Sequence, residues 1–378
     1  MNLERFALRR RLVDYLCQAR PALVERLKAT RQLAPGGATP YHMEDGVWTH
    51  VMLVLQAALE RDDFSLADML CALVHDFGKP DTARLRTGAG GLPRISFYDH
   101  GPRGVQEALD FLLDCQKAFS VSDAEICDIC FCVSKHIDFY SLDGCGQAGF
   151  FCNGRRSLLA MMARLFYCDV SGSVMDPSTE AFKDDLALLL DVQAKIAEIP
   201  LTFPDRMPKP PLLRFVCGAP GPAMDAYLAS LACPVVRETE VRRELFERRF
   251  GRKGVPLPQR YAGIYEATRP LDAAPLLLSR IRDFEGEPEI AVAGILATRR
   301  ARAGLASFLS MHLTKTAFAC TFVLTPTAGQ EAFLAGEAGA RLAKAHDFQH
   351  LPCLFHEPAF AQADVVLSRA PQGVEIAG

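Results

Sequence analysis

The sequence predicts a two-domain protein of the α plus α/β class, in which an all-α helical bundle precedes a parallel α/β sandwich. Apolar residues recur at helical spacing through most of the first half of the chain. The proline-rich stretch 200–211 (PLTFPDRMPKPP) then interrupts this pattern, because a helix does not continue through so many prolines. After it, short apolar runs alternate with helical segments, which is typical of a parallel sheet. We therefore expect domains at 1–199 and 212–378, with 200–211 as the linker between them.

Helical periodicity defines the elements of the first domain. Residues 3–29 fit one or two amphipathic helices that end before the turn residues at 35–37. Further along the chain, apolar stripes with a period near 3.6 predict four longer helices and a fifth that starts near Val105. The expected ranges of the four are Val47–Ala58, Ser65–His75, Ala124–His136 and Ser157–Asp169.

Short apolar runs define the strands of the second domain. We expect strands at Leu212–Cys217, Cys233–Val236, Glu289–Ala293, Ala317–Leu324 and Asp364–Leu367. The helices expected between them run through Met224–Leu231, over the charged segment after Val236, and over Ala297–His312 and Glu331–Ala345. Since a helix follows nearly every strand, the strands are expected to lie parallel.

Bulk composition excludes some classes of function. A net charge of −3 gives no overall attraction to nucleic acid or anionic lipid, so RNA contact would need a local patch. The candidates are Arg9–Arg11 and the cationic run within Arg237–Lys253, although charge runs are usually solvated helix faces. The 13 cysteines lack zinc-finger spacing and are expected to be small buried hydrophobes. No apolar run is long enough to span a membrane, and a cytoplasmic location is expected.

Six side chains of the types that bind divalent cations fall on or beside the first-domain helices, mostly on otherwise apolar faces. They are His50, His75, Asp76, His100, His136 and Asp169. Taken singly, each has a plainer interpretation: a core histidine with satisfied hydrogen bonds, a helix cap for Asp169, or a loop position for His100. An ionised carboxylate on a buried face is costly unless it is paired or bound to a metal. Together the six residues favour a metal site, because imidazole and carboxylate groups are the ligands of such ions.

The segment from Asp45 to Val174 resembles the HD phosphohydrolase superfamily, and most of all the HD domain fused to some CCA-adding tRNA nucleotidyltransferases. The resemblance is carried by short motifs in family order, with a hairpin-like insert that contains Gly88, Gly90 and Gly91. These motifs are Trp48-Thr49-His50, Leu73-Val74-His75-Asp76-Phe77-Gly78-Lys79-Pro80, Phe97-Tyr98-Asp99-His100-Gly101, Lys135-His136 and Cys168-Asp169-Val170.

The resemblance implies one or two divalent ions (Mn, Ni, Co, Mg, Fe or Zn) held by His50, His75, Asp76 and Asp169. It matches His100 and His136 to histidines that bind a second metal or the substrate phosphate. Such a site lowers the pKa of bound water and would hydrolyse a phosphoester of a nucleotide or an RNA end, for example a 2′,3′-cyclic phosphate. Asp76 would bridge two ions, and Lys79 would offset phosphate charge. His100 or His136 would alternatively protonate the leaving oxygen.

The second domain resembles, in layout, the P-loop kinases related to polynucleotide 5′-kinase. A strand, the turn Gly218–Gly221 and a helix form the frame of a phosphate-binding loop, and His356-Glu357-Pro358 falls late in the same layout. The lysine and hydroxyl expected at the end of that loop are here Met224 and Asp225, and the acidic pair of the next motif aligns with Thr239-Glu240. Only Arg242 keeps a plausible catalytic type.

These departures predict a kinase-like domain without kinase activity. The competing interpretation of Gly218–Gly221 is a tight strand-to-helix turn in an unrelated α/β fold. For the whole chain, the alternative to an enzyme is a scaffold or sensor that binds metal or nucleotide without catalysis and acts through the α/β domain.

Overall fold

The computed structural model divides the chain into two compact units, Met1–Thr202 and Phe203–Gly378, and each is described by itself. The linker predicted at 200–211 lies outside the described residues except for Pro211. The same holds for the helix expected at Glu331–Ala345 and for His356-Glu357-Pro358. The structure describes residues 3–36, 41–137, 156–178, 180, 187, 211–258, 261–268, 270–294, 299–313, 315–327 and 362–369.

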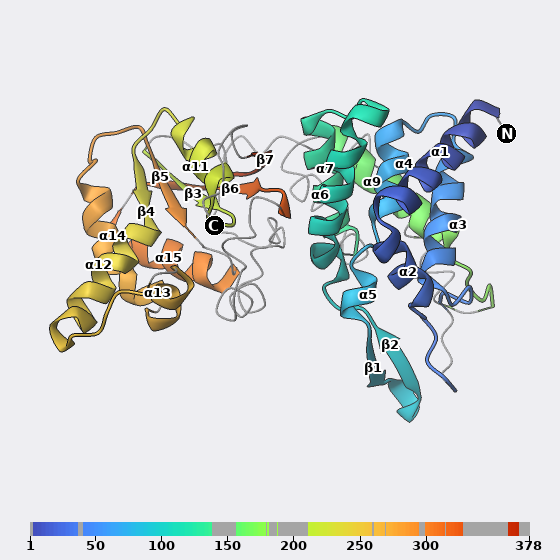
Figure 1. Cartoon of the computed structure of the whole chain (residues 1–378), viewed down its shortest axis with the longest axis horizontal. Coiled ribbons are helices and arrows are strands. Elements are labelled where there is room, and N and C mark those ends of the chain that lie inside the picture. The colour runs from blue at the N-terminus through green and yellow to red at the C-terminus, as the bar shows by residue number, and fades with distance from the viewer. Residues whose placement is uncertain are drawn as a thin grey trace. The chain divides into compact units, whose positions relative to one another are not determined.

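The described part of the first unit is a bundle of helices with one β-hairpin (Figure 1). Helix α3 packs against both α4 and α9, and α6 packs along α7. The helices are α1 (Leu3–Ala19), α2 (Pro21–Ala29), α3 (Val47–Leu59), α4 (Leu66–Val74), α5 (Lys79–Thr82), α6 (His100–Phe119), α7 (Asp123–Lys135) and α9 (Arg156–Gly172). The predicted ranges therefore agree with the observed helices to within one to three residues at each end.

Local sequence explains where the central helices begin. Ser65 and Ser122 are the N-caps of α4 and α7, and each forms a capping box with the acidic residue three positions later. Every residue of α4 from Ala67 to Val74 is buried. A helix that is apolar all round belongs in the middle of a bundle, so the residues that follow α4 enter the interior as well.

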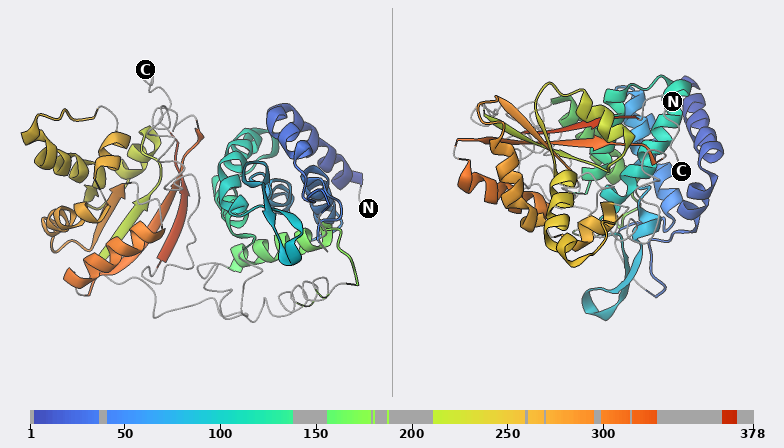
Figure 2. Two further views of the ribbon diagram at one scale, coloured as in Figure 1. Left: turned by 90° about the horizontal axis from the view of Figure 1, so that it is seen from below. Right: turned by 60° about the vertical axis from the view of Figure 1, so that its left-hand side comes forward.

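The hairpin consists of β1 (Arg84–Thr87) and β2 (Pro93–Ser96), which pair antiparallel around the short 3-10 turn Ala89–Gly91. It projects away from the helices of its unit in Figure 1 and in the right-hand view of Figure 2. Helix α6 begins directly after it at His100, not near Val105 as the sequence suggested. Asp99, in the left-handed conformation with φ 63°, turns the chain from the hairpin into the helix.

The second unit contains a five-stranded sheet in which every strand pair is parallel, as predicted. The strands lie side by side in Figure 2, in the order β4-β5-β3-β6-β7. Their bounds are β3 Leu212–Cys217, β4 Val235–Arg237, β5 Glu289–Gly294, β6 Ala317–Leu324 and β7 Gln362–Leu367. The central strand β3 is almost wholly buried, which explains why it is a continuous apolar run.

Helices α11 (Pro222–Ala229), α12 (Glu238–Phe250), α13 (Tyr261–Ala267), α14 (Pro270–Arg282) and α15 (Arg299–His312) accompany this sheet. One core lies between α11 and the sheet, where Met224 and Leu228 pack with Val216 and Val323. The connections that leave β3 and β6 run toward opposite edges of the sheet, so their carboxyl ends form a topological switch point. The turn Gly218–Gly221 follows β3 at that point.

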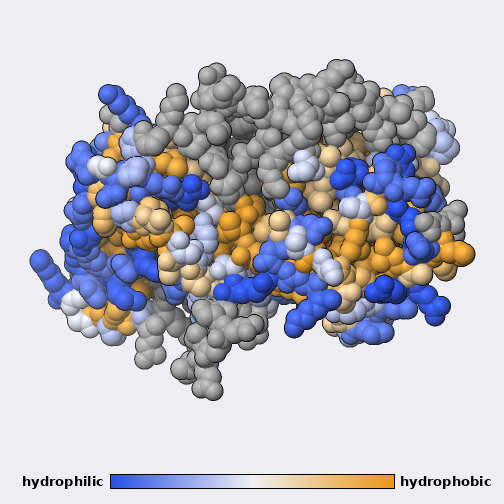
Figure 3. Space-filling model, turned by 90° about the horizontal axis from the view of Figure 1, so that it is seen from above, coloured by the Kyte–Doolittle hydropathy of each residue, from blue (hydrophilic) through white to orange (hydrophobic). Residues whose placement is uncertain are grey.

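The described surface is mixed in character. Hydrophilic and hydrophobic residues are interspersed over the coloured parts of the face shown in Figure 3. Among the described residues, no helix combines the length and the apolar character needed to cross a bilayer.

Candidate metal centre

The six predicted ligand residues lie together inside the first unit, and each is less than one-tenth exposed. They come from five parts of the bundle: α3 carries His50, the turn after α4 carries His75 and Asp76, α6 begins with His100, His136 directly follows α7, and α9 carries Asp169. Positions up to 119 residues apart in the chain therefore meet in one buried polar cluster.

One oxygen of Asp76 and one oxygen of Asp169 face the same two histidines. Asp76 Oδ2 lies 3.5 Å from His50 Nε2 and 3.2 Å from His75 Nε2. Asp169 Oδ1 lies 3.1 Å from His50 Nε2 and 3.8 Å from His75 Nε2. The Nε2 atoms of both rings therefore lie near two carboxylates.

The other oxygen of Asp76 faces the remaining two histidines. Asp76 Oδ1 lies 3.2 Å from His100 Nε2 and 3.8 Å from His136 Nε2, and the two Nε2 atoms lie 3.0 Å apart. Asp76 therefore belongs to two ligand groups, one for each carboxylate oxygen. Among the described residues, the ligand atoms of His50-His75-Asp76 and of Asp76-His100-His136 converge closely enough to hold an ion, and so do those of His42-Glu44-His50.

The hydrogen bonds of the rings indicate which nitrogen faces the cluster. His75 Nδ1 donates to the carbonyl of Ala72 at 2.8 Å, and His136 Nδ1 donates to the carbonyl of Val133 at 2.7 Å. His100 uses the same arrangement with Phe97, at 2.6 Å. Since a carbonyl oxygen only accepts, Nδ1 carries the proton in each ring, and in the neutral imidazole Nε2 is left as a bare lone pair. These are the ring tautomers that metal sites require.

The contact between His100 and His136 needs something between the rings. Two bare Nε2 lone pairs that face each other at 3.0 Å repel unless a proton or a cation lies between them. Ligand atoms about 2.0–2.1 Å from a shared ion are about 2.9 Å apart at a right angle and about 3.4 Å apart at the tetrahedral angle. Most separations in both groups are close to this range, which suits a divalent ion in each.

Buried polar atoms without hydrogen bonds also indicate a site for divalent ions. Among the described residues, His75 Nε2 and both oxygens of Asp76 are buried and make no hydrogen bond of acceptable geometry, although Lys79 Nζ lies 2.7 Å from Asp76 Oδ2 as an ion pair. Buried polar atoms are nearly always satisfied, and each exception needs an explanation such as an ion. Two ions bridged by Asp76 would satisfy all three atoms.

Electrostatics in the cluster favour ionised carboxylates. Burial alone would raise the pKa of Asp76, but His75 and Lys79 hold it well below its usual range. Burial, followed by the nearby charges of His100 and His75, lowers the pKa of His136 to about 3. Burial also tends to lower the pKa of His50, yet hydrogen bonds to Asp169 and Glu44 raise it to about 9. His136 is therefore ready to bind a cation at neutral pH, whereas His50 must first lose a proton.

Lys79 is buried beside Asp76. Its Nζ lies 2.7 Å from Asp76 Oδ2 and donates to Gln32 Oε1, also at 2.7 Å. Gln32 Nε2 in turn donates to Glu44 Oε1 at 3.3 Å. A chain of polar contacts thus connects the cluster with the loop before α3, and Lys79 is not the solvated lysine that it would be on its own.

Glu44 is a residue of the site that the sequence analysis missed. Its Oε1 accepts from His50 Nδ1 at 2.9 Å, and its Oε2 accepts from the backbone N–H of Val174 at 3.0 Å. His42 Nδ1 lies 3.0 Å from the same Oε1. Glu44 therefore orients one ligand histidine and ties the segment just beyond α9, which carries Asp169, to the loop before α3. The only sequence signal was a histidine and an acid six to eight residues before His50, in a stretch without helical period.

Close backbone contacts hold the two ligand groups together. A Cβ on Gly78 would lie 2.0 Å from the carbonyl oxygen of His100 and 2.5 Å from the backbone nitrogen of Gly104. The turn that carries Asp76 therefore touches the first turn of α6, and only glycine permits this approach.

The structure of the second unit shows the surroundings of three residues from the kinase-like layout. Met224 is buried in the core between α11 and the sheet, and Asp225 pairs with Arg237 at 2.6 Å. Arg242 is fully buried, where it binds Glu238 and the carbonyl of Thr268. Arg242 thus belongs to the interior and not to a ligand-facing surface.

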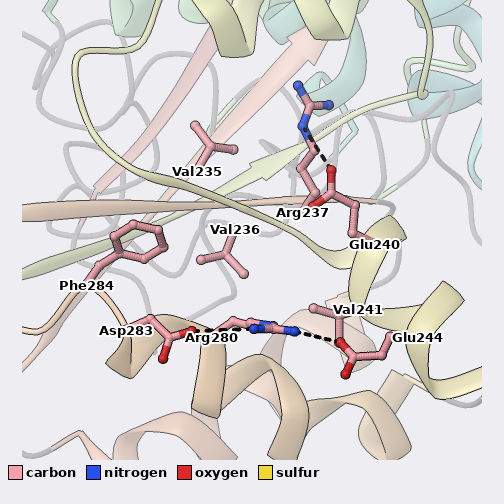
Figure 4. Close-up of a pocket in the computed structure, with 9 residues that line it drawn as sticks. All are labelled: Val235, Val236, Arg237, Glu240, Val241, Glu244, Arg280, Asp283 and Phe284. Carbon is pink, nitrogen blue, oxygen red and sulfur yellow. Dashed lines mark hydrogen bonds and ion pairs between the residues drawn. The ribbon is translucent and has the colours of Figure 1, made fainter. Parts of the chain in front are cut away.

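The cationic run within Arg237–Lys253 is largely paired. Arg248 pairs with Glu244, and Arg249 pairs with Asp272 at 2.8 Å. Figure 4 shows the neighbouring pocket of about 320 Å³, in which Arg280 lies between Glu244 and Asp283. Carboxylates on and around α12 thus reduce its attraction for RNA.

No protein-family model matches the chain, and neither a curated protein nor a solved structure does. Its function has to be inferred from the site itself.

Proposed function

We propose that the first unit is a divalent-metal-dependent phosphohydrolase or phosphodiesterase of the HD type, which acts on a nucleotide or an RNA end such as a 2′,3′-cyclic phosphate. The observation that carries this proposal is the arrangement around Asp76. Each of its oxygens faces its own set of histidines, as a carboxylate that bridges two ions would. Pairs of ions about 3.5–4 Å apart serve phosphatases and nucleases, because together they stabilise the attacking and leaving oxygens.

The residues take distinct roles in this proposal. Divalent ions would polarise the phosphoester and lower the pKa of a water molecule. Asp76 orients both ligand groups, and Lys79 supplies positive charge where a phosphate would approach them. His100 and His136 act as ligands and not as acids, since their Nδ1 atoms are committed to backbone carbonyls and their Nε2 atoms face Asp76.

The test is a metal analysis of the purified protein combined with a phosphoester panel. The panel contains nucleotides, a generic phosphodiester and RNA with a 2′,3′-cyclic phosphate end, each assayed with Mn²⁺, Ni²⁺, Co²⁺, Mg²⁺, Fe²⁺ and Zn²⁺. We expect bound metal and hydrolysis in the wild type, and loss of both in His75→Ala. The matched control is His312→Ala, which removes an exposed histidine of the second unit. If the protein binds metal but cleaves no substrate, the proposed enzymatic function is wrong. The alternative of a non-catalytic metal-binding module would then be favoured.

For the second unit we propose a kinase-like domain that does not transfer phosphate. Support comes from the position of Gly218–Gly221 at the switch point of the sheet and from the burial of Met224, where a phosphate-binding lysine would be needed. Incubation with labelled ATP and RNA carrying a 5′-hydroxyl should give no 5′-phosphate. Transfer of the label would show that this interpretation is wrong.

A cytoplasmic location is part of this proposal, because the spacing of the cysteines in the sequence gives no disulfide framework.

A further inference from the structure

The β1–β2 hairpin has one strongly cationic face. Arg84 and Arg86 of β1 lie opposite Ser96 and Arg94 of β2. Because side chains alternate along a strand, these four residues and Tyr98 share one face of the ribbon. Between Thr82 and Asp99 the sequence contains three arginines and no acidic residue.

The arginines of this face lie close together despite the electrostatic repulsion between their positive charges. Arg86 and Arg94 are direct cross-strand partners, and like charges in that position destabilise a hairpin. Their contacts are to neutral groups: Arg86 Nε donates to Ser96 Oγ at 2.9 Å, and Arg94 Nη2 donates to the Tyr98 hydroxyl at 2.9 Å. Within the described part of the chain, no carboxylate pairs with Arg84, Arg86 or Arg94. An anion bound between the strands would relieve this repulsion.

An exposed aromatic ring completes the face. Tyr98 is 59% exposed, and the guanidinium of Arg86 lies 4.9 Å from the centre of its ring. Arginines beside an exposed ring are the usual elements of single-stranded nucleic-acid binding, where the ring stacks on a base and the cations track the backbone.

The hairpin is joined directly to the metal centre at both ends. It follows α5, which begins with Lys79, and it precedes His100, the first residue of α6. Phe97 connects the two, because its carbonyl accepts from His100 Nδ1 and its ring lies 5.4 Å from Lys79 Nζ. A strand bound along the arginines therefore leads toward the ligand cluster.

We infer that the hairpin binds the sugar–phosphate backbone of single-stranded RNA, so that the substrate of the metal centre is a polynucleotide end and not a free nucleotide. The inference rests on the proposed hydrolase function. Arg84 and Arg86 are about 6.8 Å apart along the strand, a spacing comparable with that of successive phosphates in an extended strand. Tyr98 favours RNA over a membrane or an acidic protein, since neither of those supplies a base to stack on it.

The test measures binding apart from catalysis. Fluorescence anisotropy of a labelled RNA of about 12 nucleotides is recorded with the full chain in EDTA, so that no cleavage occurs. We expect Arg86→Ala/Arg94→Ala to weaken binding about tenfold and to reduce the slope of log K against log salt by about 1.4, the value for two lost phosphate contacts. Lys28→Ala/Lys117→Ala removes the same charge from exposed helix positions outside the candidate cationic patches and should bind as the wild type does.

Three further variants separate binding from folding and from charge alone. Arg86→Lys/Arg94→Lys keeps the cations and should retain affinity within about threefold, since phosphate contacts depend mainly on charge. Tyr98→Phe keeps the ring and should bind normally, whereas Tyr98→Ala should bind less tightly.

Several outcomes would overturn the inference. These are unchanged affinity in the double alanine variant, an equal loss in the Lys28 and Lys117 control, or stronger dependence of anionic-vesicle binding than of RNA binding on the two arginines. The two proposals can fail separately. If the protein hydrolyses a small phosphodiester but the hairpin variants do not change RNA binding, only the inference about the hairpin is wrong. If the hairpin binds RNA but the protein hydrolyses no phosphoester, the proposed hydrolase function is wrong.

Discussion

Glu44 offers the sharpest test of the proposed metal centre, because it lies on the Nδ1 side of His50, whereas Asp76 and Asp169 lie on the Nε2 side. Its Oε1 accepts from His50 Nδ1 at 2.9 Å and so fixes the ring with Nε2 toward Asp169 and Asp76. Carboxylates in this position set the tautomer and raise the basicity of the histidine. In Glu44→Ala the His50 ring loses both effects, whereas Glu44→Gln keeps an acceptor but removes the charge.

The structure sets the expected size of the effect. Loss of such a partner typically weakens metal affinity by about 10- to 100-fold, which is about 1.4–2.7 kcal/mol of binding free energy. Glu44→Ala also leaves the amide of the buried Gln32 without its acceptor, which lowers the free energy of unfolding by about 1–3 kcal/mol, whereas the exposed Val174 N–H can bond to water instead. Glu44→Gln should show the smaller effect on both quantities.

The assay is a metal titration against a chelating dye, with unfolding by denaturant measured in parallel. The control is Glu25→Gln, which changes an exposed carboxylate that pairs with Lys28. Wild-type metal affinity in both Glu44 variants would refute the reasoning, since His50 would then need no support from the carboxylate.

Three further predictions concern the same centre. Asp76→Asn should abolish the binding of both ions while the far-UV circular dichroism of the helices persists, since one carboxylate serves both groups; retention of one tightly bound ion would disprove the bridge. Gly78→Ala should lower the free energy of unfolding by about 3 kcal/mol or more, because its Cβ would meet the carbonyl oxygen of His100 at 2.0 Å, whereas Gly251→Ala, with open space around its Cβ, should change it little. Metal affinity should rise about tenfold between pH 7 and pH 8, because His50, with its pKa raised to about 9, must release a proton before it binds; titrations at the two pH values with equal affinities would exclude this.

Helix positions and candidate ligands could be predicted from the sequence because buried helix faces produce apolar residues at helical spacing. His50 and Asp169 follow apolar residues at helical spacing, and Ser65 marks the start of α4. The strands of the sheet were equally visible, since β3 and β6 are buried on both faces and are therefore continuous apolar runs. Periodicity gives the face on which a residue lies, but not the residue that it meets.

The rest of the centre depends on contacts between segments, which periodicity does not encode. Glu44 and Gln32 lie outside the apolar stripes, and their roles arise only when the loop before α3 meets Lys79 and His50. The start of α6 at His100 depends on the left-handed Asp99, a local choice that a polar loop sequence does not specify. The cationic face of the hairpin follows from its register, which places Arg86 opposite Arg94.

The histidines that close α4 and α7 have one more consequence. In each, the ring N–H satisfies a carbonyl of the last helical turn, so the bond that finishes the helix also aims the opposite nitrogen inward. Glutamate or cysteine at these positions would still attract a cation but would leave the carbonyl of the last helical turn without its hydrogen-bond donor. This restricts the substitutions that are tolerated there. In the proposed centre the polypeptide would thus set the donor positions before any ion arrives, and geometry, ligand type and the supply of metals would together decide which ion binds.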